Sequence, residues 1–144
     1  MFDSVLVVCA GNICRSPTGE YVLKQKLKGK NVKVSSAGLT ALEGKPADAK
    51  AKQIAQTHGV NMDEHKGRQL SSALVAQNSV ILVMEERHLN DVHARYPEAR
   101  GKTFLLGKWI NNAEIPDPYR QSTEAFEHVY TLIDSACSAW QKYL

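Results

Sequence analysis

A buried strand that runs into a short loop and then into a helix constrains this chain more than any other stretch. Residues 5–8 read Val-Leu-Val-Val, which is typical of a strand covered on both faces of a sheet. Ser16 and Pro17 are typical of the start of a helix. The loop between them begins with Cys9 and ends with Arg15. Because a helix N-terminus after such a loop favours negative charge, this stretch predicts an anion site.

The residue types in the loop suit a tetrahedral phosphoryl group. A guanidinium binds two phosphoryl oxygens at once, so Arg15 is predicted to hold the substrate. Cys9 is predicted to be the nucleophile, because a helix N-terminus and a nearby cation lower a thiol pKa from about 8.5 to about 3.5–7.5. A cysteine after an ordinary strand is more often a small buried apolar residue. Gly11 and Asn12 tolerate unusual backbone angles, and the amides expected to bind phosphate are those of Ala10, Gly11, Asn12, Ile13 and Cys14.

Length and composition favour one domain spanning residues 1–144, since 43% hydrophobic residues are enough for a core. The net charge of +3 suits an anionic substrate, but it is spread along the chain and does not indicate a nucleic-acid partner. We find no signal peptide and no apolar run of the roughly 20 residues that span a bilayer. The three cysteines suit a reducing compartment. We therefore expect a cytoplasmic monomer that is not embedded in a membrane.

Strand and helix patterns alternate along the chain, which predicts an α/β fold with a parallel sheet and helices on both faces. Ligands bind beyond the carboxyl ends of such strands. The loops that begin at Cys9, Leu39 and Glu85, and the later one that carries Asp117, should therefore meet at one edge. Strands are expected at residues 5–8, 31–36, 79–84 and 103–106, and helices at 17–28, 47–58, 70–76, 86–95 and 122–142.

The loop pattern of Cys, five residues, Arg and Ser resembles the active site of the low-molecular-weight protein tyrosine phosphatases. Further matches follow in the family's order: Ser-Ala-Gly at 36–38, His-Lys-Gly-Arg-Gln at 65–69 and Asp-Pro-Tyr at 117–119. Leu39, Leu42 and residues 114–120 resemble the bacterial branch that serves capsule and exopolysaccharide systems. The resemblance implies a four-stranded sheet in flavodoxin-like order and hydrolysis of phosphotyrosine without a cofactor or metal. It also implies a partner, the tyrosine-rich tail of a membrane tyrosine autokinase.

Hydrolysis of a phosphate ester needs an acid for the leaving oxygen, and Asp117 is the best candidate. Pro116 and Pro118 stiffen its loop, although Pro-Asp-Pro is also ordinary turn chemistry. Cys9 is expected to attack phosphorus while Asp117 protonates the departing phenol. Asp117 then activates the water that releases phosphate from a cysteinyl-phosphate. Ser16 is expected to donate a hydrogen bond to the sulfur and assist its departure.

Supporting and specificity roles depend on the resemblance. It implies that Asn12, Ser36 and His65 form a network that holds the loop in its strained shape. The mouth of the site is expected to be lined by Leu39, Leu42 and Tyr119, although Tyr119 could equally belong to the core. By spacing alone, His88 and His93 do not face one another as a metal pair would, and we expect both on a solvated helix surface. The stripe that contains Cys137 predicts a core residue.

Three alternatives remain open. An arsenate reductase uses a similar loop but needs further cysteines, and residues 80–89 contain none. A phosphotyrosine-binding module would retain Arg15 but would need neither Cys9 nor Asp117. A redox protein would use Cys9 with Cys14, which in a phosphatase could instead protect an oxidised Cys9 as a reversible disulfide.

Overall fold

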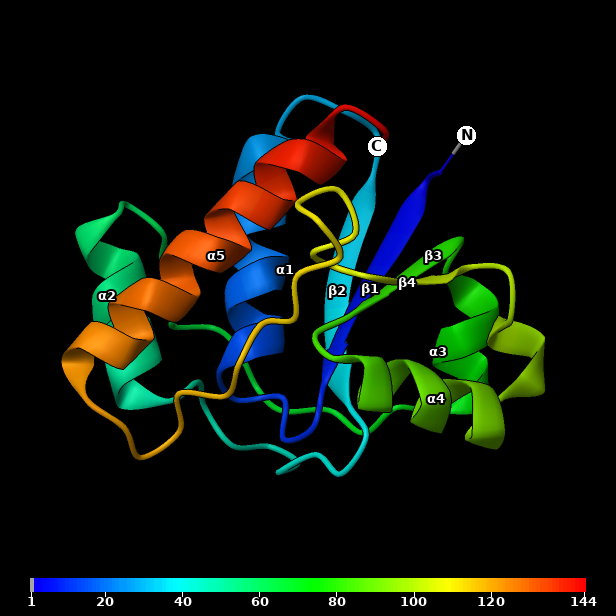
Figure 1. Ribbon diagram of the computed structural model, residues 1–144, viewed down its shortest axis with the longest axis horizontal. Helices are drawn as coiled ribbons and strands as arrows, with labels where there is room; N and C mark the ends of the chain where they lie inside the picture. Colours follow the sequence, from blue (N-terminus) through cyan, green and yellow to red (C-terminus); the bar gives the residue numbers. More distant parts are fainter. Residues whose placement is uncertain (1) are drawn as a thin grey trace.

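The computed structural model describes residues 2–144, which fold around a four-stranded parallel sheet with the strand order β2-β1-β3-β4 (Figure 1). The predicted α/β class and the flavodoxin-like order are confirmed. The chain turns from β1 to β2 on one side and later to β3 on the other, so a ligand crevice opens beyond the end of β1. The strands are β1 (Ser4–Cys9), β2 (Lys33–Gly38), β3 (Val80–Val83) and β4 (Thr103–Leu105).

Helices cover both faces of the sheet, as the alternating pattern predicted. Figure 1 shows α1 and α5 together with α2 on one side of the strands, and α3 with α4 on the other. The helices are α1 (Arg15–Lys26), α2 (Ala49–Thr57), α3 (Ser72–Gln77), α4 (Glu86–Arg95) and α5 (Thr123–Gln141), with a short 3-10 helix η1 (Pro97–Ala99). None of the helices in residues 2–144 combines the length and the apolar character needed to cross a bilayer.

Side chains of β1 alternate between two apolar clusters, one on each face of the sheet. Val5, Val7 and Cys9 pack with α1, α2 and α5, whereas Leu6 and Val8 pack with α3 and α4. Cys9 therefore ends the strand pointing toward the face that α1 covers. Gly19 allows α1 to lie close to this face, because a Cβ there would be 3.0 Å from the Val7 Cγ1 atom.

The elements were predicted in the right order, but several boundaries shift by one or two residues. The first helix starts at Arg15 rather than Pro17, so the arginine belongs to its first turn. The second strand ends at Gly38 rather than residue 36, because its pairing continues until Cys9 lies opposite Gly38. Pro97 begins η1 in addition to ending the preceding helix. The predicted stripe of α5 is buried, and Cys137 is a core residue.

Candidate active site

The backbone of the loop between β1 and α1 has its carbonyl groups bound by the surrounding chain. The Cys9, Ala10 and Gly11 oxygens accept the N–H groups of Leu39, Thr40 and Leu42 at 2.9, 2.9 and 3.0 Å. Farther along, Ile13 accepts from the Asp48 N–H at 2.7 Å, and Cys14 from the Thr18 N–H at 3.1 Å. Asn12 adopts the left-handed conformation with φ of 58°, and its carbonyl accepts from His65 Nε2 at 2.6 Å.

The N–H groups of the same loop remain available. Among residues 2–144, the N–H groups of residues 10–15 donate no hydrogen bond. A run of such donors at a helix N-terminus is an anion-binding nest. Of the two residues that tolerate unusual backbone angles, Asn12 has a positive φ, whereas Gly11 does not.

Cys9 lies at the floor of a cavity of about 270 Å³ beyond the end of β1. Its side chain is buried, and its Sγ atom is 2.9 Å from Ser16 Oγ. The backbone N–H of Ser16 also donates to the sulfur at 3.4 Å. Both contacts come from the first turn of α1, because the loop brings residue 16 back beneath the strand end. The structure thus places two donors where a negative sulfur would need them.

Arg15 is buried and is held on one side by groups that the sequence did not identify. Its NH1 group donates to Glu85 Oε2 at 2.5 Å and to the Ile115 carbonyl at 2.8 Å. An NH1 group has two hydrogens, so these bonds use both. The NH2 and Nε edge is left to bind two oxygens of a phosphoryl group. Glu85, which caps the start of α4 just after β3, was predicted only as the start of a loop at the site edge.

Glu85 is itself tightly held. Arg87 donates to both carboxylate oxygens, from Nε at 3.0 Å and from NH2 at 3.2 Å. Hydrogen bonds from Arg87 and then from Arg15 lower the pKa of Glu85 to about 2, against the opposing effect of its partial burial. The carboxylate is therefore charged wherever the protein is folded at ordinary pH, and the Arg15 guanidinium has a permanent counter-charge.

Asp117 lies at the rim of the same cavity, with a side chain that is 47% exposed. Its Oδ2 atom is 3.9 Å from Arg15 NH2, and its Oδ1 atom accepts the Tyr119 N–H at 3.0 Å. The loop is anchored just before the aspartate, because the Ile115 N–H donates to the Met84 carbonyl at 2.9 Å. Asp117 can thus reach a leaving oxygen on the open side of a phosphate held by Arg15.

The mouth of the cavity differs from the prediction at one position. Leu42 and Tyr119 line it with exposed side chains, as expected. Leu39 does not line it, because its side chain is buried in the core cluster on the α3 and α4 face. The loop after β2 turns Thr40 toward the cavity instead. Residues 39 and 40 form a turn after β2, and the sequence did not show which of the two side chains this turn would direct to the cavity.

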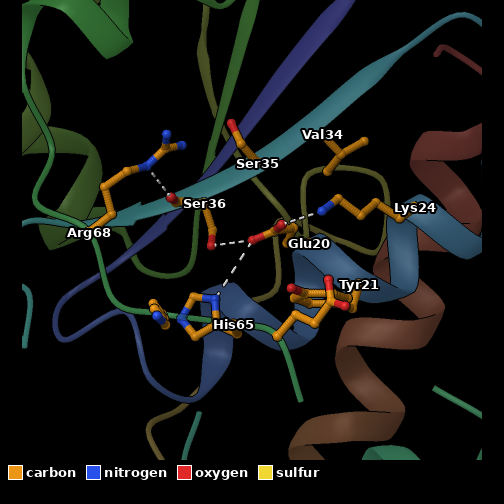
Figure 2. Close-up of a pocket in the computed structure, with 10 residues that line it drawn as sticks. Glu20, Tyr21, Lys24, Val34, Ser35, Ser36, His65 and Arg68 are labelled. Atoms are coloured by element: carbon orange, nitrogen blue, oxygen red, sulfur yellow. Dashed lines mark hydrogen bonds and ion pairs between the residues drawn. The ribbon is translucent and has the colours of Figure 1, made fainter. Parts of the chain in front are cut away.

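A network of polar side chains lies behind the loop, and Figure 2 shows the part of it around Ser36 and His65. The Arg68 N–H donates to Asn12 Oδ1 at 2.8 Å, which fixes the orientation of this amide. Asn12 Nδ2 then donates to Ser16 Oγ at 2.8 Å and to Ser36 Oγ at 3.0 Å. Since Ser16 accepts from Asn12, its own hydrogen is free to be donated to Cys9. The predicted partners Asn12, Ser36 and His65 are brought together.

Glu20 completes this network and was missed from the sequence. It accepts from Ser36 Oγ at 2.5 Å and from Lys24 Nζ at 2.6 Å, and its Oε1 atom lies 4.0 Å from His65 Nδ1. Glu20 follows Arg15 by five residues in α1, and nothing in the neighbouring sequence marks it as a buried member of the site. Its position on the face of α1 toward β2 could be found only from the tertiary arrangement.

The histidines of α4 were predicted to be solvated, and this is wrong for His88. Its side chain is buried, and Nδ1 accepts the Glu85 N–H at 3.2 Å as part of the helix cap. Burial and the nearby Arg15 charge lower the pKa of His88 to about 4. His93 is half-buried. In residues 2–144, no group of three His, Cys, Asp or Glu side chains is placed to hold a metal ion.

The other cysteines differ from Cys9 in their surroundings. Burial and the neighbouring Cys9 raise the pKa of the Cys14 thiol, and burial raises the pKa of Cys137. Cys14 lines the cavity, whereas Cys137 does not. All three cysteines are free. The protective role of Cys14 stays a prediction.

Comparisons with known proteins agree with this geometry. Residues 4–144 match the family described as low molecular weight phosphotyrosine protein phosphatase. The low molecular weight protein-tyrosine-phosphatase Etp of Escherichia coli K12 is 50% identical over 143 residues, which cover 99% of this chain and 95% of that protein. Wzb of the same organism is 46% identical over 144 residues, covering 100% of this chain and 97% of that protein.

Solved structures of similar sequence have the same fold. Vibrio vulnificus Wzb in complex with benzylphosphonate superposes with a TM-score of 0.96 at 53% identity, and each chain is covered completely. The tyrosine phosphatase AmsI of Erwinia amylovora has a TM-score of 0.95 at 46% identity, over 100% of this chain and 94% of that one.

Proposed function

The chain belongs to the low-molecular-weight phosphotyrosine protein phosphatase family, and we propose that it hydrolyses protein phosphotyrosine with Cys9, Arg15 and Asp117 as its catalytic residues. The observation that carries this assignment is the loop itself. A buried sulfur with two donors lies at the floor of a cavity whose N–H groups have no acceptor among residues 2–144.

In the first step, Cys9 attacks phosphorus as the thiolate, and the bond to the phenolic oxygen breaks. The loop amides and the free edge of Arg15 bind the equatorial oxygens, whose charge they stabilise. Asp117 donates its proton to the departing tyrosyl oxygen. The products are a cysteinyl-phosphate on Cys9, a neutral tyrosine side chain and an ionised Asp117.

In the second step, the ionised Asp117 takes a proton from a water that attacks phosphorus. The bond to sulfur breaks, and inorganic phosphate and the Cys9 thiolate are formed. Ser16 stabilises the returning thiolate by donating its hydroxyl hydrogen, which the Asn12 amide leaves free. Asp117 ends the cycle protonated, so the enzyme returns to its initial state.

The shape of the cavity supports an aromatic phosphate ester. Cys9 is buried at the floor, whereas Leu42 and Tyr119 are exposed at the mouth. A short aliphatic phosphate would have to bring its backbone into this opening, while a tyrosyl ring spans it. Benzylphosphonate, which joins a phenyl ring through one carbon to a phosphonate, is bound by the similar Wzb of Vibrio vulnificus.

The physiological substrate and the cellular compartment are further parts of the proposal. We infer a cytoplasmic monomer whose substrate is the phosphorylated tail of a membrane tyrosine autokinase in an exopolysaccharide or capsule system. The resemblance of residues 114–120 to the capsule-associated bacterial branch supports this inference, as does the similarity to Wzb and AmsI.

Turnover of p-nitrophenyl phosphate and of a phosphotyrosine peptide tests the reaction. We expect both to be hydrolysed, and a Cys9→Ser or Asp117→Ala variant to retain the phosphorylated autokinase tail from a lysate. Binding of the peptide without turnover would identify a phosphotyrosine-binding module instead. Arsenate reduction, or an activity that survives Asp117→Asn, would support the arsenate reductase or redox alternatives.

A further inference from the structure

Arg120 is held at the mouth of the cavity by an unusual backbone conformation. Its φ is 63°, in the left-handed region that a non-glycine residue rarely adopts. The Gln121 N–H donates to the Pro118 carbonyl at 2.8 Å, and Gln121 Nε2 donates to the Asp117 carbonyl at 3.0 Å, so the turn is closed on both sides. The guanidinium carbon lies 5.2 Å from the centre of the Tyr119 ring. Because Tyr119 lines the cavity, the positive charge is held beside its opening.

A second cation reaches the same turn from a different element. Lys50, in the first turn of α2, donates from Nζ to the Gln121 carbonyl at 2.8 Å. An ammonium group has three hydrogens, so this bond leaves two of them for another acceptor. Within residues 2–144, neither Arg120 nor Lys50 has a carboxylate within 4.0 Å. We call these two side chains the basic rim.

The two sides of the mouth differ in charge. The basic rim lies beside Tyr119, on the side that also carries the exposed acid Asp117, whereas Thr40 and Leu42 on the other side are neutral. The exposed residue that follows Leu42 in the chain is Glu43, an acid. A peptide whose phosphotyrosine enters the cavity must pass its neighbouring residues over this mouth. Acidic groups in that peptide would be attracted to one side and repelled from the other.

We propose that the basic rim selects phosphotyrosine sites with acidic groups beside them, either carboxylates or further phosphates. This inference rests on the proposed function and adds its substrate preference. The rim acts outside the phosphate cradle, so it changes which peptide is dephosphorylated rather than how the phosphoryl group is transferred. Exposed charge pairs contribute about 0.2–1 kcal/mol, which corresponds to about a 1.4- to fivefold preference for each cation.

The experiment compares two phosphotyrosine peptides of equal length. One carries Asp and Glu around the phosphotyrosine, and the other carries Asn and Gln at the same positions. The measured quantity is the ratio of kcat/KM for the acidic peptide to kcat/KM for the neutral peptide, from the release of phosphate at low salt. A ratio cancels effects on the chemical step that both peptides share. The proteins are the parent, Arg120→Gln, Lys50→Gln and a matched control, Arg100→Gln.

We expect the parent ratio to be about three to ten, and each rim variant to lower it by about 1.4- to fivefold. Arg120→Lys keeps the charge and should keep most of the preference, which separates charge from the shape of the turn. Arg100 is exposed and precedes β4, at the amino ends of the parallel strands, whereas the Cys9 loop lies at their carboxyl ends, so Arg100→Gln should leave the ratio unchanged. Salt of about 1 M should bring the parent ratio toward one, because the Debye length falls to about 3 Å.

A parent ratio near one at low salt would overturn the proposal, as would a clear preference that both rim variants retain. Equal hydrolysis of the two peptides would contradict only the proposal that the basic rim selects acidic sites. A parent protein that hydrolyses neither peptide nor p-nitrophenyl phosphate would contradict the proposed function itself, so the two failures are distinguishable.

Discussion

Two cavities lie on opposite sides of the Cys9 loop, and the larger one is not where the chemistry is expected. The front cavity, about 270 Å³, contains Cys9, Arg15 and Asp117. The rear cavity, about 330 Å³, is lined by polar residues that include Glu20 and His65 (Figure 2). At the rear, the buried polar groups form hydrogen bonds with one another, as Glu20 does with Ser36 and Lys24.

The front differs because its donors are unmatched within the protein. The N–H groups of residues 10–15 have no acceptor among residues 2–144, and Arg15 has an unused edge. Unmatched donors attract an anion, whereas matched ones only stabilise the fold. Asn12 belongs to both regions, since its side chain joins Ser36 at the rear to Ser16 at the front. The comparison predicts large catalytic effects at the front and mainly structural effects at the rear.

The largest effect should come from Cys9→Ala. Without the sulfur no cysteinyl-phosphate forms, and we expect turnover of p-nitrophenyl phosphate to fall by at least about 10⁴-fold. The amides and Arg15 remain, so inorganic phosphate should still bind, which calorimetry can measure. Cys137→Ala serves as the control, because Cys137 lies in the core away from the cavity. Residual turnover of the Cys9 variant above one hundredth of the parent would contradict the assignment.

Asp117→Asn should have the next largest effect. An asparagine cannot donate the proton that the leaving oxygen needs, so kcat should fall by about 10²- to 10⁴-fold for phenyl phosphate. The loss should be smaller for p-nitrophenyl phosphate, whose leaving group needs less protonation. Equal losses for the two substrates would argue against Asp117 as the general acid.

Glu85→Gln should reduce phosphate binding through Arg15. A hydrogen bond to a charged group contributes about 1.5–3 kcal/mol, so kcat/KM should fall by about ten- to hundredfold. The folded-state pKa of Glu85 is lowered from 4.5 to about 2, so its contribution to stability is complete above pH 4.5. That contribution is lost as the pH falls toward 2.

Denaturant unfolding of the parent and Glu85→Gln at several pH values checks the sign of this effect. The difference in unfolding free energy should be constant near neutral pH and should shrink between pH 4.5 and 2. A difference that grows as the pH falls would show that Arg87 and Arg15 do not hold the carboxylate as described.

The smallest catalytic effect is expected at the rear, from Glu20→Gln. The weaker bond with Ser36 should lower the unfolding free energy by about 1–3 kcal/mol, while turnover falls less than about tenfold. Lys24→Gln is the matched control, because it removes the 45% exposed partner of the same carboxylate and should cost less than about 1 kcal/mol. A loss of turnover as large as that of Asp117→Asn would remove the distinction between the two cavities.

Local patterns in the sequence were sufficient for the fold class and for the centre of the candidate site. Strand and helix periodicity depends on neighbouring residues, and so do the loop angles that Asn12 tolerates. The pattern from Cys9 to Ser16 lies within one strand, one turn and one helix start. Its geometry therefore follows from local preferences. The family resemblance then added Asp117, Ser36 and His65 to the predicted site.

Only the tertiary structure decided which distant groups meet that centre. Glu85 is 70 residues from Arg15, and Ile115 is 100 residues from it, yet both hold the same NH1 group. The structure also turned Leu39 into the core, Thr40 toward the cavity, and His88 inward beneath Glu85. Such contacts depend on how elements pack against a shared sheet. A leucine, a threonine or a histidine beside a turn can face either the core or a cavity, so the sequence by itself did not decide the direction of each side chain.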